Sequence, residues 1–291
     1  TRRETGMAPP KPWRSQKRWI LEFKSDRTND HMSNVDSNDD PTQQPTCNPQ
    51  WTHVPILYED DVVVAVSKPS GMFVHRSEAD RSATEFVVQN VRDQIGSFVY
   101  PVHRLDRATS GVLLLAKSSE AAALFSEMFA ERKIHKTYHA LARGYCDDSF
   151  TVNRPLVSSK GRGKPAGHPQ TIPQDAETHF ELLEKFELPF ASGQHATTRC
   201  SLVEARPVTG RYHQIRRHLA GTSHPIIGDA EHGDTKLNRV FQQHTNVTRL
   251  MLVAVKIEFV HPVTDTLTVI ACPPAESFSS VIESIRAASS I

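Results

Sequence analysis

The sequence predicts an α+β protein with a mixed, mainly antiparallel β-sheet core, flanked by helices and loops. Short β-branched runs outnumber segments with helical spacing, and no regular alternation of strands and helices is sustained. No apolar stretch in the 291 residues approaches the ~20 residues of a membrane-spanning helix. We therefore expect a water-exposed protein without a membrane partner.

Runs of β-branched and other apolar residues locate the strands. Each run is short, and turn-forming or charged residues bound it. Residues 158–177 are rich in Gly, Pro and Lys and predict a long loop, which is often functional. The predicted strands are residues 62–66, 112–116, 136–145, 180–186, 197–205 and 249–272, the last divided by a turn at 261–265.

Apolar residues at helical spacing locate the helices. Gly96 follows the first such segment, as expected of a helix end, and the second begins with Ser and ends with basic residues. The third places Tyr212, Ile215 and Leu219 on one face. The predicted helices are residues 82–96, 118–133, 209–221 and one from about residue 277.

The N-terminal composition differs from that of the rest. Residues 1–53 are rich in Asn, Asp, Gln, Pro and Ser and offer little to bury, so they predict a disordered polar tail. A single domain is expected over residues 54–291. The four cysteines are scattered without a C-x-x-C pair, which favours the cytoplasm and argues against disulfides or structural zinc.

Charge does not mark the whole chain as a nucleic-acid binder, because the formal net charge is only +1. It is unevenly distributed, however. Between Arg199 and Arg217 there are five arginines and one acid, Glu204. Such a local basic surface can bind phosphates.

The segment HRLDRATSG, residues 103–111, places Asp106 between Arg104 and Arg107. Nearby cations favour the ionised carboxylate and lower its pKa. An ionised carboxylate in a cleft can act as a nucleophile. The alternative is a structural ion pair or a turn cap, and local sequence does not decide between them.

Two other arrangements of these residues are weaker. A triad of Ser110, His103 and Asp106 lacks the G-x-S-x-G elbow of hydrolases that use one. His103, His213 and His218 lack an acidic partner at ligand spacing, so no metal site is predicted.

Basic residues crowd the segment RPVTGRYHQIRRH. A solvated basic face explains such a run, whereas a Thr-Gly turn at a helix start also attracts phosphate. In the strand at 136–145, Tyr138 could stack on a base, accept a proton or simply be half-buried. The segments KPSG (residues 68–71) and GDAEHGD (residues 228–234) predict turns.

Six segments together resemble the RluA-type pseudouridine synthases in order and spacing. They are KPSG, HRLDRATSG, KTYHALARG, TGRYHQIRRH, HPIIGDAEHGD and RLMLVAVKIEFVHPVTD, and the resemblance runs from residue 56 to 271. It implies a pseudouridine synthase catalytic domain with its cleft across the sheet. YEDDVVVAVSKPSGMFVHRSEADR and VVQNVRDQIG further resemble the TruC branch, which isomerises uridine 65 in the T-stem of tRNA.

The resemblance also implies residue roles. Asp106 would be the nucleophile, Tyr138 would pack against the target base and assist proton removal from C5, and Arg216 would hold Asp106 ionised. Arg104 would occupy the gap left by the extruded nucleotide. Whether Asp106 attacks the base, attacks the sugar or acts through a glycal stays open. The residues expected to bind RNA are Arg104, Arg107, His103, Arg211, His213, Arg217 and Lys136.

The expected partner is RNA, most specifically tRNA, and neither a metal nor an organic cofactor is implied. A monomer is expected. The alternatives are the same chemistry on rRNA or another tRNA site, or a non-catalytic RNA-binding protein or chaperone. A carbohydrate hydrolase would normally need a second carboxylate, for which the sequence shows no candidate.

Overall fold

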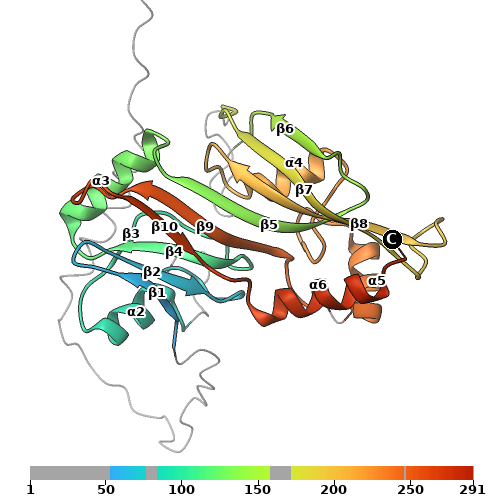
Figure 1. The fold of residues 1–291 in the computed structure, drawn as a ribbon, viewed down its shortest axis with the longest axis horizontal. Coiled ribbons are helices and arrows are strands. Elements are labelled where there is room, and N and C mark those ends of the chain that lie inside the picture. The colour runs from blue at the N-terminus through green and yellow to red at the C-terminus, as the bar shows by residue number, and fades with distance from the viewer. Residues whose placement is uncertain (1–52, 77–83, 158–171, 246, 291) are drawn as a thin grey trace, which may run out of the picture. The chain divides into compact units, whose positions relative to one another are not determined.

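A ten-stranded β-sheet forms the centre of the described chain (Figure 1). The computed structural model describes residues 53–76, 84–157, 172–245 and 247–290. Except for residue 53, the predicted tail lies outside the described residues, as do residues 158–171 of the predicted loop.

The sheet is mixed and mainly antiparallel, which confirms the predicted fold class. Its strand order is β1-β2-β4-β9-β5-β8-β7-β6, with β3 on β4 and β10 on β9. Among the described strand pairs, only β4 and β9 run parallel. The strands are β1 (Ile56–Glu59), β2 (Val63–Lys68), β3 (Tyr100–Pro101), β4 (Ser110–Ala116), β5 (His135–Arg143), β6 (Ser149–Asn153), β7 (Glu177–Leu188), β8 (Thr198–Pro207), β9 (Leu252–Val260) and β10 (Leu267–Ala271).

Helices flank the sheet. Helix α3 contacts β4, α4 contacts β8, and α6 contacts both β7 and α5. Figure 1 shows α5 and α6 side by side beneath the β8 end of the sheet. The described helices are α2 (Val87–Ile95), α3 (Ser119–Ala130), α4 (Gln214–Gly221), α5 (Thr235–Thr245) and α6 (Glu276–Ala288).

The helix ends differ from the sequence predictions. Gly96 caps α2 with a left-handed backbone, as predicted, but α3 ends at Ala130. Arg132, expected in the last helical turn, has a φ of 61° and lies beyond the helix. Helix α5 was not predicted, because only Leu237 and Phe241 give it a buried apolar stripe.

Helix α4 is shorter than predicted. His213 has φ 51° and ψ 32°, a left-handed conformation that ends the helix on its N-terminal side, so α4 begins at Gln214. Ile215 and Leu219 are buried as expected. Tyr212 lies outside the helix with 42% of its surface exposed, so its predicted place on the buried face was wrong.

Strands β4 and β9 approach each other closely at Gly111, which pairs with Ala254. Gly111 has a φ of 109°, and a Cβ added there would lie 2.1 Å from the Ala254 carbonyl oxygen. Only glycine fits such a contact. The segment just before β4, which contains Asp106, is thereby held at the centre of the sheet.

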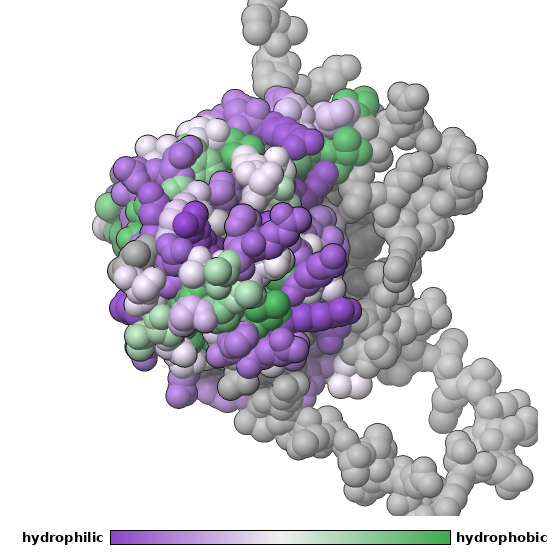
Figure 2. All heavy atoms as spheres, turned by 90° about the vertical axis from the view of Figure 1, so that its right-hand side faces the viewer, coloured by the Kyte–Doolittle hydropathy of each residue, from purple (hydrophilic) through white to green (hydrophobic). Residues whose placement is uncertain are grey.

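The surface is mainly polar on the face drawn in Figure 2, where hydrophobic side chains form small groups among hydrophilic ones. Scattered apolar residues of this kind are normal on a water-exposed surface. None of the helices in the described ranges combines the length and apolar character needed to cross a membrane.

Candidate active site

The backbone around Asp106 is held by a buried lysine. The side chain of Lys68, at the end of β2, is fully buried, and its Nζ donates hydrogen bonds to three carbonyl oxygens. These belong to Pro69 at 2.8 Å, Arg107 at 3.0 Å and Thr109 at 2.8 Å. Because an ammonium group has three donors, all of them are satisfied, and the loop beside Asp106 is fixed to β2.

The turn after Lys68 adds further ties to this loop. Ser70 Oγ donates to the Ala108 carbonyl at 2.7 Å, and the Gly71 N–H donates to the Arg107 carbonyl at 2.8 Å. The Arg107 side chain turns back onto the same turn: its Nε donates to the Gly71 carbonyl at 2.9 Å and its guanidinium lies 4.8 Å from the Phe73 ring centroid. Arg107, predicted to bind RNA, thus anchors the loop.

Asp106 faces helix α4. Its Oδ2 lies 3.3 Å from Nη1 of Arg216 and 3.7 Å from Nε2 of His213. The Asp106 side chain is 19% exposed to solvent. The carboxylate is therefore both partnered and reachable, as a nucleophile must be.

Burial raises the pKa of Asp106, while the charges of Arg216, Arg104 and Lys68 act in the opposite direction. Arg104 lowers this pKa as predicted, but burial outweighs the cations, so the net direction is opposite to the one predicted. Sequence adjacency shows the cations but not the loss of water around the carboxyl group.

Arg216 is fixed by a second carboxylate. Its Nε and Nη2 donate to the two Asp229 oxygens, each at 2.7 Å. Asp229 also accepts backbone hydrogen bonds from Glu231 at 2.9 Å and His232 at 3.0 Å. Burial disfavours the charge of Asp229, but these hydrogen bonds outweigh it and lower its pKa. The bidentate pair aims the remaining guanidinium nitrogen at Asp106.

Tyr138 lies in β5, opposite Ala205 of β8 and Ala254 of β9. Only 8% of its surface is exposed. Burial and the negative charge of Asp106 both raise the pKa of Tyr138. The phenol near Asp106 therefore stays protonated at neutral pH and can donate a hydrogen bond.

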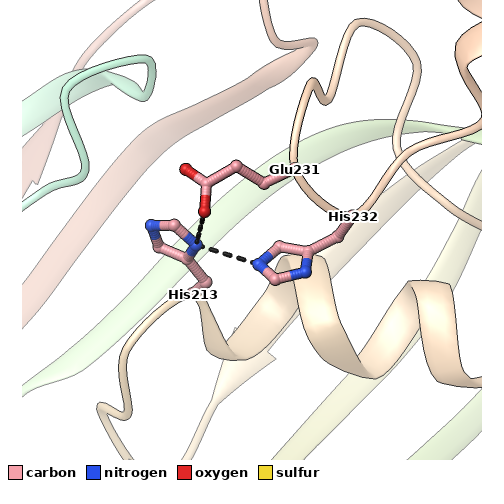
Figure 3. Close-up of side chains that lie close together, drawn as sticks. All are labelled: His213, Glu231 and His232. Carbon is pink, nitrogen blue, oxygen red and sulfur yellow. Dashed lines mark hydrogen bonds and ion pairs between the residues drawn. The ribbon is translucent and has the colours of Figure 1, made fainter. Parts of the chain in front are cut away.

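Figure 3 shows His213, before α4, facing Glu231 and His232 from the loop that precedes α5. His213 Nδ1 lies 2.9 Å from His232 Nε2 and 3.6 Å from Glu231 Oε2. Their ligand atoms lie within 4.8 Å of one another, a spacing that could hold a metal ion. Arg216 Nη2 is 3.7 Å from Glu231 Oε1, so its charge competes with a cation there.

Neither the hydrolase triad nor the three-histidine site considered from the sequence forms. His103 Nε2 accepts the Leu114 N–H at 2.9 Å, and burial lowers the pKa of His103 to about 3. Ser110 Oγ accepts a hydrogen bond from Arg249 at 2.6 Å. His218 contacts Thr178 Oγ1 at 3.0 Å.

Two predicted RNA-binding arginines of the basic segment reach backbone carbonyls. Arg211 Nε donates to Asp175 at 2.9 Å, and Arg217 Nη1 donates to Val157 at 3.0 Å. The first contact ties the segment before α4 to Asp175, within the predicted long loop, and the second ties α4 to Val157, just before that loop. The structure thus gives both side chains a positioning role, and their contact with RNA stays a prediction.

The remaining predicted RNA-binding residues, Arg104 and Lys136, differ in exposure. Arg104 is exposed, and its positive charge acts to lower the pKa of Asp106. Lys136, in β5, lies 5.8 Å from the Phe129 ring centroid, and burial lowers its pKa to about 8. Arg104 is therefore the better placed of the two to meet phosphate beside the site.

Sequence reasoning missed Lys68, Asp229, Glu231, His232 and Tyr212 as parts of this site. The first four belong to segments predicted as turns, and they do form turns or the ends of strands. A lysine closing an apolar strand and an aspartate following the apolar HPIIG were available signals. Both side chains are buried, and buried charges require partners.

Comparisons with known proteins point to one family. The RNA pseudouridylate synthase family model matches residues 62–221. The tRNA pseudouridine synthase C of Vibrio cholerae is 48% identical over 217 residues, which cover 74% of this chain and 88% of that protein. The Salmonella typhi protein of the same name is 44% identical over 228 residues, covering 78% and 88%.

Solved structures share the fold. Human RNA pseudouridylate synthase domain containing 1 aligns with a TM-score of 0.61 and 23% identity over 79% of this chain and 88% of that one. Human RNA pseudouridylate synthase domain containing 4 aligns with a TM-score of 0.60 and 22% identity over 80% and 93%. With the sequence matches, these alignments confirm the predicted resemblance: the chain belongs to the RNA pseudouridylate synthase family.

Proposed function

We propose that this protein isomerises uridine to pseudouridine in tRNA, with uridine 65 of the T-stem as its target. The contact between Asp106 and Arg216 carries the proposal, because it presents one ionisable carboxylate, held by a buried cation, at a partly exposed position. The relatives named tRNA pseudouridine synthase C support tRNA as the substrate.

The reaction rearranges bonds within one nucleotide. The bond between uracil N1 and ribose C1′ breaks, the base turns, and a bond forms from C5 to C1′ while C5 loses a proton and N1 gains one. Asp106 enables the first cleavage, and Tyr138 packs against the base. Because the product is an isomer of the substrate, no oxidant, reductant or organic cofactor is required.

A paired uridine must leave the helix to reach Asp106. Flipping a base out of a stem costs roughly a few kcal/mol. Contacts of basic side chains with phosphates offset that cost, and Arg104, exposed beside Asp106, takes the vacated place in the stem.

The test is pseudouridine mapping in tRNA transcripts incubated with the protein, alongside a transcript with cytidine at position 65. Wild type should modify position 65 only, and Asp106→Asn should modify nothing. Modification of rRNA or of another tRNA site would replace the proposed target. Binding without modification would identify a non-catalytic RNA-binding protein.

We further propose that the protein acts as a cytoplasmic monomer without a metal. The three described cysteines, Cys146, Cys200 and Cys272, are buried free thiols, which supports a reducing compartment. Light scattering at the concentrations used for activity tests the monomer, and a molar mass near twice that of one chain would contradict it.

A further inference from the structure

Tyr212 is an exposed aromatic residue that stacks on His213, the neighbour of the proposed catalytic carboxylate. It lies two residues before the start of α4, and 42% of its surface is accessible. Its ring stacks on that of His213, with centroids 3.6 Å apart and planes inclined by 21°. One face of the Tyr212 ring is therefore covered by an imidazole while the residue remains open to solvent.

The imidazole beneath Tyr212 is held firmly. His213 is 6% exposed, and its Nδ1 lies 2.9 Å from Nε2 of His232. On its other side, Nε2 lies 3.7 Å from Asp106. Tyr212 thus stacks on a buried ring that one hydrogen bond at Nδ1 orients, which limits the freedom that the phenol loses on binding.

The charged groups of the site also affect Tyr212. Burial raises the pKa of Tyr212, and the charges of Glu231 and Asp106 raise it further, while Arg216 and Arg104 oppose them. The Tyr212 ring stacks on an imidazole that lies 3.7 Å from Asp106 and 3.6 Å from Glu231, so it lies one residue away from these carboxylates.

This setting suits a nucleobase better than an aliphatic or protein ligand. A nucleotide offers a flat base for the ring and a phosphate for the neighbouring cations, among them Arg217, whose Nη1 lies 3.5 Å from the Tyr212 carbonyl. Tyr138, assigned to the target uracil, lies in β5 on a different element. Extruding the uridine also uncovers the faces of its neighbours in the stem.

We propose that the Tyr212 ring, backed by His213, is a second stacking surface that takes a base flanking the extruded uridine. This inference rests on the proposed function, because it needs an RNA substrate from which one nucleotide has been withdrawn. It assigns Tyr212 to substrate binding and leaves the bond rearrangement to Asp106.

The test compares wild type with Tyr212→Ala, Tyr212→Phe and a matched control, Phe98→Ala. Phe98 is 68% exposed, lies between α2 and β3, and contacts Arg92. The substrate is a T-stem hairpin with 2-aminopurine in place of the base on either side of the uridine. Stopped-flow fluorescence reports stacking before conversion, and single-turnover rates at varied protein concentration give the half-saturating concentration and the maximal rate.

Stacking on one aromatic ring is worth about 1–3 kcal/mol, or roughly 5- to 150-fold in affinity. Tyr212→Ala should raise the half-saturating concentration within this range and abolish quenching at one flanking position. Tyr212→Phe and Phe98→Ala should match wild type. Unchanged quenching in Tyr212→Ala would overturn the proposal, as would a Tyr212→Phe defect equal to that of alanine, which would assign the effect to the hydroxyl.

The outcome separates the two proposals. If wild type forms no pseudouridine in the hairpin, the proposed function fails, while quenching that depends on the Tyr212 ring still supports the stacking surface. If wild type converts the hairpin and Tyr212→Ala quenches and converts it equally well, only the stacking surface fails.

Discussion

Arg216 donates hydrogen bonds to Asp229 through Nε and Nη2, and its third nitrogen, Nη1, faces Asp106. The two bonds to Asp229 are 2.7 Å long, whereas the contact with Asp106 is 3.3 Å. The shorter pair is buried and the longer one is partly exposed. Asp229 therefore sets the position of the guanidinium, and Asp106 receives its charge while keeping an accessible oxygen.

Replacing Asp229 with Asn should impair both stability and catalysis. The change leaves a buried guanidinium without its counter-charge, a loss worth about 3–5 kcal/mol when one partner of a buried pair is removed. A misaimed Arg216 should also slow the single-turnover rate by about 100-fold. Denaturant unfolding and the rate on tRNA measure the two effects.

The control for Asp229 is Glu184→Gln. Glu184 forms a similar two-bond pair with Arg286, at 2.9 and 2.7 Å, but on the surface. This variant should leave both stability and rate nearly unchanged. Equal stability and equal rates in the two variants would show that Asp229 does not position Arg216 for catalysis.

The acid limb of the pH–rate profile should follow Asp106 and shift in Arg216→Gln. Burial raises the Asp106 pKa, and Arg216 works against that rise, so removing the cation raises the pKa further. Because the carboxylate form is the active one, the midpoint of the acid limb should move to higher pH. Single-turnover rates across pH measure it, with Arg286→Gln as a remote control. An unmoved midpoint would mean that another group titrates.

Removal of metal ions should leave the reaction rate unchanged. Protein side chains carry each proposed step, and the possible ligands His213, Glu231 and His232 are held by hydrogen bonds and ion pairs to one another and to Arg216. Rates after dialysis against EDTA, compared with undialysed protein, provide the measurement. Lost activity that Zn²⁺ restores would instead assign a metal to these residues.

Most strands of the sheet, and Asp106 as a candidate, could be predicted from the sequence because their signals are local. Apolar runs located most strands, and the HRLDRATSG motif singled out Asp106. Tyr138 and the basic segment with Arg216 were noted as candidates from their residues, but their roles came from the resemblance of whole segments. The described structure then brings Arg216 to Asp106.

What the sequence could not predict depends on contacts between distant segments. Asp229 and Lys68 looked like ordinary turn residues, because nothing local shows that one is buried against Arg216 and the other against three carbonyls. The pKa direction of Asp106 was missed for the same reason, since burial is a property of the fold. No sequence signal indicates the left-handed backbone conformation of His213, which places Tyr212 outside α4.

Lys68→Met should loosen the loop that carries Asp106. The variant keeps an apolar stem but removes the Lys68 donor from three carbonyl oxygens. The Arg107 carbonyl keeps the Gly71 N–H, whereas the Pro69 and Thr109 carbonyls lose the lysine, and an unsatisfied buried group costs about 1–3 kcal/mol. We expect a loss of roughly 2–6 kcal/mol in unfolding free energy, measured by denaturant, and a lower rate under conditions where the variant is fully folded. Lys117→Met is the control, because Lys117 bonds Glu59 and the Asp60 carbonyl at a more exposed position. If Lys68→Met were no slower than Lys117→Met, the lysine would stabilise the fold without positioning Asp106.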